Sequence, residues 1–202
     1  MSASVITMMG GMGRWEPDAR GRLEQAALEL FRERGFEQTT TAEIAKRAGL
    51  TERTFFRHFA DKREVLFGGA ARFQERVVGS VAAAPAGVPP IDAVAAGLDA
   101  VAGHLQDLRT HSIARYAVIT ATPELQEREL IKLASLASAV AETLRTRGVP
   151  EPAASLSAEA GIAAFKVAYE RWVEGGQEQE LGDLIRDSLR ALNAVTAAAT
   201  PA

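Results

Sequence analysis

The stretch from Thr40 to Lys62 limits the possible fold more than any other part of the chain. In residues 40–45, a threonine is followed three positions later by a glutamate, just before a pair of apolar residues. This spacing predicts a helix start in which the Thr40 hydroxyl caps the Glu43 amide and the Glu43 carboxylate returns to the Thr40 amide. Gly49 predicts the end of that helix, because glycine accepts the left-handed backbone of a turn.

A second short helix is expected directly after this turn. Thr51 can cap it, and Phe55 and Phe59 recur four residues apart on its inward face. Two short helices that cross at a steep angle need a small residue at the crossing, and Ala45 meets that need. The other inward positions are Ile44, Ala48 and Leu50. Together these features predict a helix-turn-helix, whose second helix would lie in the major groove of DNA.

Charge is unevenly distributed along the chain. The formal net charge of -3 would argue against a nucleic-acid partner if it were spread evenly. Residues 46–63, however, contain six basic and two acidic residues. A phosphate backbone attracts such a cluster, although a charge cluster by itself is more often a solvated helix face. The helix-turn-helix pattern around it favours the interpretation as a DNA contact.

Composition excludes several other classes of function. The chain has no cysteine, which excludes disulfides, thiolate zinc sites and cysteine nucleophiles, and a reducing cytoplasm is expected. No run of about 20 apolar residues is present, so no membrane partner is expected. Residues 1–13 lack a basic residue ahead of an apolar run and do not resemble a secretory signal. Residues 1–16 and 198–202 are expected to be disordered tails.

Helical periodicity extends over the rest of the chain, and no segment alternates as a strand would. A first helix is expected from Pro17 to Gly35, and a fourth from Asp61 to about Ala83, before a proline-containing loop at 84–90. The later helices are expected at residues 91–108, 112–121, 123–147, 157–174 and 181–196. The sequence therefore predicts an all-α protein of about nine helices. Its expected parts are a three-helix DNA-binding domain at 17–67 and a helical ligand-binding and dimerisation domain at 68–197.

The motif Thr-Thr-x-x-Ile-Ala-x-x-Ala-Gly at 40–49, followed by Thr-x-x-Thr-Phe-Phe-x-x-Phe-x-x-Lys-x-x-x-Leu at 51–66, resembles the DNA-binding domain of TetR-type repressors. Residues 26–36 resemble the first helix of that family. The remaining chain carries a weaker likeness, chiefly at 115–123 and 172–176. This resemblance implies a transcriptional repressor that binds a palindromic double-stranded DNA operator as a homodimer and leaves it when a small hydrophobic ligand binds.

The resemblance also implies particular DNA contacts. Thr40 resembles a phosphate contact at a helix N-terminus, Lys62 resembles a backbone-anchoring lysine, and Arg53 is expected to read guanine. The family usually has tyrosine where this chain has Phe56, so a phenolic hydrogen bond to phosphate is lost and Phe56 would touch a thymine methyl or a sugar. His58 has two open interpretations, a phosphate contact or a packing role. The full predicted DNA-binding set is Thr40, Thr41, Thr51, Glu52, Arg53, Thr54, Phe56, Arg57, His58 and Lys62.

The helix expected at 157–174 is apolar on several sides, so it must be covered on more than one of them. The last helix has a similar apolar content. In the resembled family the final two helices pair with their copies in a four-helix dimer interface. The predicted dimer contacts are Ile162, Phe165, Leu181, Leu184, Ile185, Leu189 and Leu192.

The resemblance further implies a ligand pocket inside the regulatory part of the chain. Its predicted lining is Phe73, Val77, His104, Leu108, His111, Tyr116, Phe165, Tyr169 and Trp172, although apolar residues at helical spacing are more often ordinary core. A mostly apolar lining suits a hydrophobic or aromatic effector, which the sequence does not identify. His104 and His111 could share a face if one helix continued between them, but no nearby cluster supplies further ligands. No metal or cofactor is expected.

Two other classes of function have weaker support in the sequence. An all-α enzyme would need a constellation of titratable groups, and the chain has no Gly-rich phosphate loop, Glu-x-x-His pair or Gly-x-Ser-x-Gly elbow. Enzymatic activity is therefore not expected. A helical interaction module with a basic face would have no need for the Ala45 and Gly49 turn geometry. Salt-dependent binding to duplex DNA distinguishes the three classes.

Overall fold

The computed structural model describes residues 18–197, so the expected tails and Pro17 lie outside the described part of the chain. Within this part, nine α-helices and one 3-10 helix account for the secondary structure, and strands are absent. The elements are α1 (Ala19–Arg34), α2 (Thr41–Arg47), α3 (Glu52–His58), η1 (Arg63–Phe67), α4 (Ala70–Ala83), α5 (Pro90–Asp107), α6 (Arg109–Thr120), α7 (Pro123–Thr146), α8 (Ala153–Glu174) and α9 (Leu181–Ala197). The predicted all-α class is confirmed.

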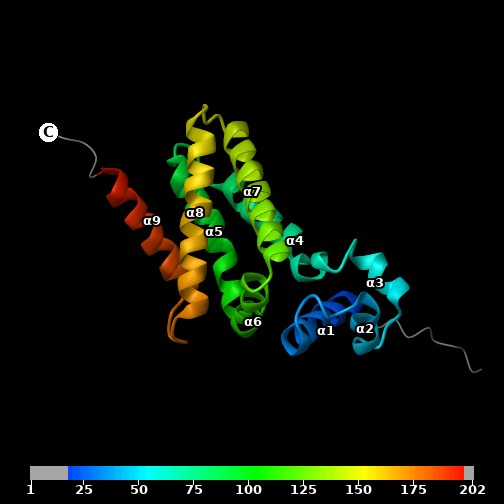
Figure 1. The fold of residues 1–202 in the computed structure, drawn as a ribbon. Helices are drawn as coiled ribbons and strands as arrows, with labels where there is room; N and C mark the ends of the chain where they lie inside the picture. Colours follow the sequence, from blue (N-terminus) through cyan, green and yellow to red (C-terminus); the bar gives the residue numbers. More distant parts are fainter. Residues whose placement is uncertain (1–17, 198–202) are drawn as a thin grey trace, which may run out of the picture.

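Helices α1, α2 and α3 form the small unit at one end of the molecule (Figure 1). The predicted inward aromatic residues are buried there, with the Phe55 and Phe59 ring centroids 5.5 Å apart. Phe31 of α1 packs against Phe36 at 5.1 Å between centroids. Burying several aromatic rings contributes a large share of the stabilisation of a unit this small.

The start of α2 and the turn between α2 and α3 have the predicted geometry. The Thr40 hydroxyl accepts a hydrogen bond from the Glu43 amide at 3.2 Å, and the Glu43 carboxylate accepts one from the Thr40 amide at 3.0 Å. Gly49 has a φ of 68°, and Ala45 is buried at the crossing. The capping box and the helix-turn-helix are therefore confirmed.

The single fourth helix expected from Asp61 to Ala83 is wrong. The structure instead has the short η1, a break at Gly68 and Gly69, and then α4. The Arg20 guanidinium of α1 donates to the Gly68 carbonyl at 2.6 Å. A Cβ on Gly68 would lie 1.9 Å from the Glu24 carboxylate, so a larger residue would have to push the Glu24 side chain aside. The packing against α1 therefore separates η1 from α4.

The larger part of the molecule is a bundle in which α4, α5, α7 and α8 lie together (Figure 1). Helix α9 packs against α8 and α5 at the edge of this bundle. Its core includes the fully buried Trp172. Glycines allow two close helix crossings: a Cβ on Gly97 would lie 2.7 Å from Val81, and one on Gly161 would lie 2.4 Å from Val94. In residues 18–197, no helix combines the length and the apolar character needed to cross a bilayer.

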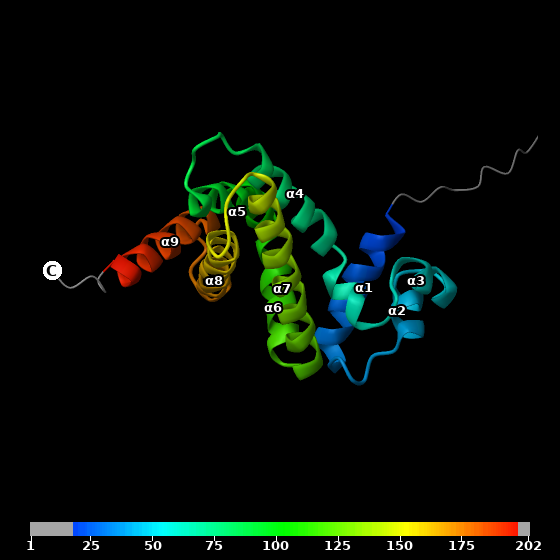
Figure 2. The ribbon, with the colours of Figure 1, turned by 90° about the horizontal axis from the view of Figure 1, so that it is seen from above.

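Helix α6 and the start of α7 pack against the helix-turn-helix unit and so form a contact between the two parts. Seen from above, they lie beside α1 (Figure 2). Val118 and Ile119 of α6 and Leu125 of α7 are buried in the same apolar cluster as α1, α2 and α3. The core of the helix-turn-helix unit is therefore completed by residues that lie beyond the expected boundary after residue 67.

Candidate nucleic-acid interface

Helix α3 presents an exposed face formed by the start and middle of the helix. Thr51 caps it by accepting the Thr54 amide at 3.2 Å, and the two hydroxyls lie 3.0 Å apart. Arg53 and Arg57 are exposed, and so is Phe56, at 53%. The Phe56 ring meets Phe55 edge-on at 5.4 Å between centroids, and the rest of its surface is open to contact a base or a sugar.

The starts of α2 and α3 are joined by a side-chain hydrogen bond. The Thr41 hydroxyl donates to the Glu52 carboxylate at 2.5 Å. This bond favours a fixed separation of the two helix ends that would face the phosphates and the base edges. Glu52 therefore helps to hold the start of α3 in position relative to the start of α2.

Lys62 is engaged within the protein. Its ammonium donates to the Phe36 carbonyl at 2.7 Å and lies 4.0 Å from the centroid of the Phe36 ring. This contact ties the chain after α3 to the loop between α1 and α2. An ammonium has three donors, so two remain for a phosphate, and the predicted anchoring contact stays a prediction.

His58 is half-buried beside Phe59, with ring centroids 6.4 Å apart. Its Nε2 atom is buried and has no hydrogen-bond partner within residues 18–197. A buried nitrogen cannot reach a phosphate without a side-chain movement. Of the two interpretations left open by the sequence, the packing role fits this geometry better.

The six cations of residues 46–63 differ in their partners. Arg47 reaches back to Glu33 of α1 at 2.9 Å, Arg63 pairs with Asp61 at 2.8 Å, and Lys62 binds the Phe36 carbonyl. The hydrogen bond from Arg47 holds the pKa of Glu33 below its ordinary value. Of these six cations, Lys46, Arg53 and Arg57 have neither an ion pair nor a hydrogen bond to a carbonyl within residues 18–197. These three supply uncompensated positive charge at the end of α2 and along α3.

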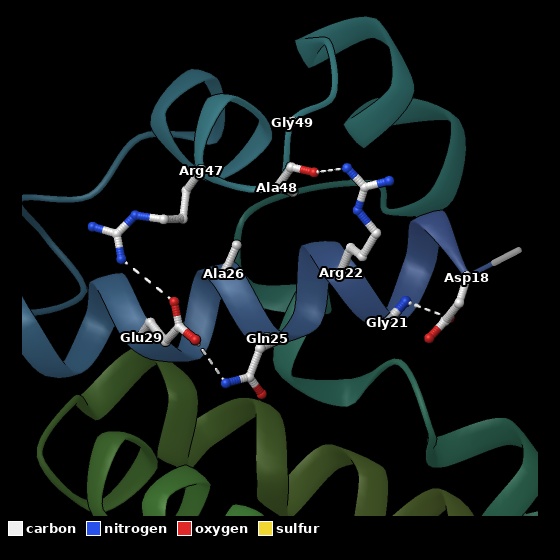
Figure 3. Close-up of a pocket in the computed structure, with 9 residues that line it drawn as sticks. All are labelled: Asp18, Gly21, Arg22, Gln25, Ala26, Glu29, Arg47, Ala48 and Gly49. Carbon is white, nitrogen blue, oxygen red and sulfur yellow. Dashed lines mark hydrogen bonds and ion pairs between the residues drawn. The ribbon is translucent and has the colours of Figure 1, made fainter. Parts of the chain in front are cut away.

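A hollow of about 580 Å³ lies between α1 and the turn after α2 (Figure 3). The Arg22 guanidinium crosses it to donate to the Ala48 carbonyl, and Gln25 donates to Glu29 at 2.8 Å. Charges of both signs line the hollow. None of the predicted ligand residues lines the hollow. The hydrogen bond from Arg22 to the Ala48 carbonyl holds the turn that borders it.

Five of the predicted ligand residues come together in the regulatory bundle as an aromatic cluster. Its ring centroids are linked at 5.6 Å (Phe73 to Phe165), 5.9 Å (Phe165 to Tyr169), 5.6 Å (Tyr169 to Trp172) and 6.2 Å (Tyr116 to Tyr169). Val77 is fully buried in the same core. Burial raises the pKa of the Tyr169 hydroxyl above its ordinary value.

Two of the predicted lining residues are corrected by the structure. His104 and Leu108 are exposed, so they do not line the interior of the bundle. Helix α5 ends at Asp107 and α6 begins at Arg109, so His104 and His111 lie on separate helices. The described residues contain no group of three potential metal ligands. Burial, followed by the nearby Arg115 charge, lowers the pKa of His111.

Most of the predicted dimer contacts are also corrected. All but Leu192, which is partly exposed, are buried within the protomer's own core, so they are covered without a partner: Ile162, Phe165, Leu181, Leu184, Ile185 and Leu189. The large apolar side chains that α8 and α9 do expose are Leu156, Val167 and Val195, at 65%, 50% and 74%. Helical periodicity located the apolar faces of these helices but did not show which face the protomer itself covers.

Contacts between the helix-turn-helix unit and the bundle were not evident from the sequence. Glu64 of η1 pairs with Arg128 of α7, and also with Lys132 at 3.2 Å. Arg115 of α6 donates to the Leu66 carbonyl at 2.8 Å. These partners are far apart in sequence, so local patterns could not reveal them. The one signal was that Arg115 begins the segment 115–123, which carried a weak family likeness.

The fold and the exposed α3 face define a helix-turn-helix transcriptional regulator with a separate helical bundle. Two family models match the chain: one for bacterial regulatory proteins of the tetR family at residues 24–67, and one for the MftR C-terminal domain at residues 88–197. The chain belongs to the TetR family of DNA-binding transcriptional regulators.

Two curated relatives are similar to it. The regulator TcmR of Streptomyces glaucescens is 39% identical over 88 residues, which is 44% of this chain and only 39% of TcmR. The putative mycofactocin biosynthesis transcriptional regulator MftR of Mycobacterium tuberculosis is 26% identical over 136 residues, covering 67% of this chain and 69% of the relative.

Solved structures share the fold at low identity. The fatty acid degradation regulator FadR of Bacillus halodurans has a TM-score of 0.62 at 16% identity, covering 88% of this chain and 95% of that one. Thermus thermophilus FadR in complex with lauroyl-CoA has a TM-score of 0.53 at 24%, covering 86% and 93%. The SmeT–triclosan complex, from Stenotrophomonas maltophilia, has a TM-score of 0.58 at 22%, covering 89% and 90%.

Proposed function

We propose that this regulator is a repressor that binds a palindromic operator as a homodimer and is released by a small hydrophobic ligand. The observation that carries the proposal is the exposed α3 face, where Arg53 and Arg57 have no ion pair within the described chain. An exposed guanidinium that has no acidic partner can make bidentate contacts with base edges and phosphates. The protein acts through binding rather than catalysis, and it works in the cytoplasm, where its DNA lies.

Within the interface, the residues divide by what they can reach. Thr40 and Thr41 lie at the start of α2, where helix amides and the helix dipole favour a phosphate. Arg53 reads guanine, and Phe56 contacts a thymine methyl or a sugar. Thr51, Glu52 and Thr54 at the start of α3, with Arg57 and Lys62 after them, complete the proposed set, and His58 is assigned the packing role.

The aromatic cluster supports a hydrophobic ligand. Phe165 and Tyr169 lie at its centre, and a flat or flexible apolar molecule that separates such rings would replace one apolar contact with another. Thermus thermophilus FadR and SmeT, which share the fold, were solved with lauroyl-CoA and triclosan. To act as an inducer, the ligand must bind the DNA-free state more tightly than the DNA-bound state.

The exposed apolar side chains of α8 and α9 support a homodimer. Leu156 and Val167 are about three helical turns apart, so they lie on the same side of α8, and Val195 lies near the end of α9. Large apolar side chains left exposed on one face are typical of association surfaces in soluble proteins. A two-fold axis at this face would present a pair of α3 helices to half-sites about 34 Å apart, one turn of B-DNA.

Titration of the purified chain against duplex fragments flanking its own gene tests the proposal. We expect one fragment to bind far more tightly than unrelated duplex, with an affinity that falls as salt rises from about 50 to 200 mM. A fragment with one half-site scrambled is the control and should bind much more weakly. Equal, micromolar binding to every fragment would contradict an operator-specific function.

A further inference from the structure

Arg115 is a largely buried charge at the junction between the helix-turn-helix unit and the bundle. Its side chain is 19% exposed. Its Nε donates to the Leu66 carbonyl at 2.8 Å, and its other nitrogens donate to Glu129 of α7 at 2.6 and 3.3 Å. The guanidinium also lies 5.0 Å from the centroid of the Phe67 ring. One side chain thus joins the last turn of η1 to α6 and α7.

Helix α6, which carries Arg115, also contacts the aromatic cluster. The ring of Tyr116, the residue after Arg115, lies 6.2 Å from the ring of Tyr169 between centroids. The Tyr169 hydroxyl also reaches the Ser112 carbonyl of α6 at 3.5 Å. Arg115 therefore lies on α6 between Ser112 and Tyr116, the two residues that contact Tyr169 in the chain of rings that leads to Phe165.

The short helix η1 carries the chain from the helix-turn-helix unit into the bundle. The Arg20 contact at Gly68 fixes the end of η1 to α1, so η1 and the helix-turn-helix unit are expected to move together. On the bundle side, η1 is held by Arg115 at Leu66 and by α7 cations at Glu64. Of these attachments, the one through Arg115 comes from α6, the helix whose Ser112 and Tyr116 contact Tyr169.

We propose that Arg115 is a positioning residue for DNA recognition: it transmits the arrangement of the aromatic cluster around Tyr169 to the orientation of the helix-turn-helix unit. A buried guanidinium must keep its partners, because leaving one unpaired is costly. A molecule that displaces the Tyr169 ring changes the contacts of α6 at Ser112 and Tyr116. A shift of α6 carries Arg115 with it, and thereby the Leu66 carbonyl and η1. This inference rests on the proposed function, since it describes how the ligand would change the spacing of two α3 helices.

The orientation can be measured without DNA or ligand. The chain has no cysteine, so Ala60→Cys in the segment after α3 and Ser138→Cys on α7 provide two selective spin-label sites in the 202-residue chain. Labelled chains diluted into excess unlabelled chains report the distance within one protomer. We expect Arg115→Lys, which keeps the charge but loses the planar fork, to broaden or shift the distance distribution.

Arg145→Lys is the matched control. Arg145 also forms ion pairs from α7, with Glu142 and Glu151, but it lies at the end of α7 away from η1. Its replacement should leave the distribution unchanged. Tyr169→Phe removes only the hydroxyl, and it should change the distribution in the same direction as Arg115→Lys. Tyr169→Phe decides the question if Arg115→Lys fails to fold by circular dichroism.

A second measurement uses operators whose half-sites are moved apart or together by one base pair. Arg115→Lys should reduce the discrimination between spacings by about 2- to 30-fold while leaving the salt dependence unchanged. Unchanged distances in both Arg115→Lys and Tyr169→Phe would overturn the inference. If the distances change but the wild-type chain binds no operator, the positioning role stands and the proposed function fails.

Discussion

At the level of single side chains, the helix-turn-helix motif combines cations that have partners with cations that do not. Arg47 and Lys62 hold α2 and the loops in place through Glu33 and Phe36. Arg53 and Arg57 have no ion pair within residues 18–197 and remain available on α3. Local charge alone could not make this distinction, because the partners come from α1 and from the loop after it.

Replacing Arg53 with alanine should relax specificity at one base pair, at a cost of about 1 to 3 kcal/mol, because a bidentate base contact is lost. Lys62→Ala is the comparison: it should weaken binding about equally on all sequences and reduce the salt slope by about one. Fluorescence anisotropy against operators with single base-pair changes provides the measurement. A uniform loss of affinity in both variants would show that Arg53 is not a base reader.

A melting curve of Lys62→Ala separates its two roles. The ammonium also holds the Phe36 carbonyl, so part of any loss in DNA affinity could come from a displaced loop. If the melting temperature falls while the salt slope stays at the wild-type value, Lys62 acts on the fold and not on a phosphate.

At the level of elements, α2 is too short to be stable by itself, so its capping box matters. Thr40→Ala should destabilise the protein by about 1 kcal/mol, because the Glu43 amide loses its acceptor. Thr40→Ser keeps the hydroxyl and is the control. Chemical denaturation of both variants at neutral pH provides the measurement, and equal stabilities of Thr40→Ala and the wild type would contradict the role of the cap.

The same cap has a pH dependence. Hydrogen bonds from the Thr40 amide and then from its hydroxyl, at 2.9 Å, lower the pKa of Glu43 below its ordinary value of 4.5. When the pKa is lower in the folded state, the stabilisation is complete above the unfolded value and is lost as the pH falls through the folded value. The difference in stability between Thr40→Ser and Thr40→Ala should therefore shrink in acid. Denaturation of both variants across the acidic range measures this difference, and a constant value would contradict the carboxylate's part in the cap.

Elements with local signals were predictable from the sequence. The capping box at Thr40, the Gly49 turn and the helix starts at prolines depend on neighbouring residues only. The single helix predicted across Gly68 and the start of α8 at Ser157 were wrong because other contacts decide them. At the start of α8, the Glu151 carboxylate accepts the Ser155 hydroxyl at 2.9 Å, which supports a helix that begins at Ala153.

The candidate sites were predictable to a similar extent. Exposure of the α3 residues followed from the amphipathic pattern around Phe55 and Phe59. The ligand-lining and dimer-contact residues of the bundle were harder to predict, because an apolar position indicates that a side chain is buried but not which element or subunit buries it. Ile185 illustrates the difficulty, since the sequence assigned it to a partner subunit and the structure buries it within the protomer.

At the level of the whole molecule, the proposed binding of an operator by two chains would depend on the exposed apolar side chains of α8 and α9. Val167→Glu should weaken dimerisation strongly, because it places a charge in the middle of an apolar contact. Ile131→Glu adds the same charge at another exposed apolar position, on α7, and should have little effect. Sedimentation velocity over a concentration series measures both, and equal behaviour of the two variants would contradict the proposed face.

The burial of Val118, Ile119 and Leu125 against α1 has a consequence for how such regulators can be recombined. A chimera joined after residue 67 would pair the α1 surface of one protein with the α6–α7 elbow of another, that is, the end of α6 and the start of α7. The new contact between them would contain mismatched side chains and cavities in a core that each parent fills with its own side chains. Transplanting DNA specificity between relatives therefore requires moving the elbow together with the motif, although the two lie far apart in the chain.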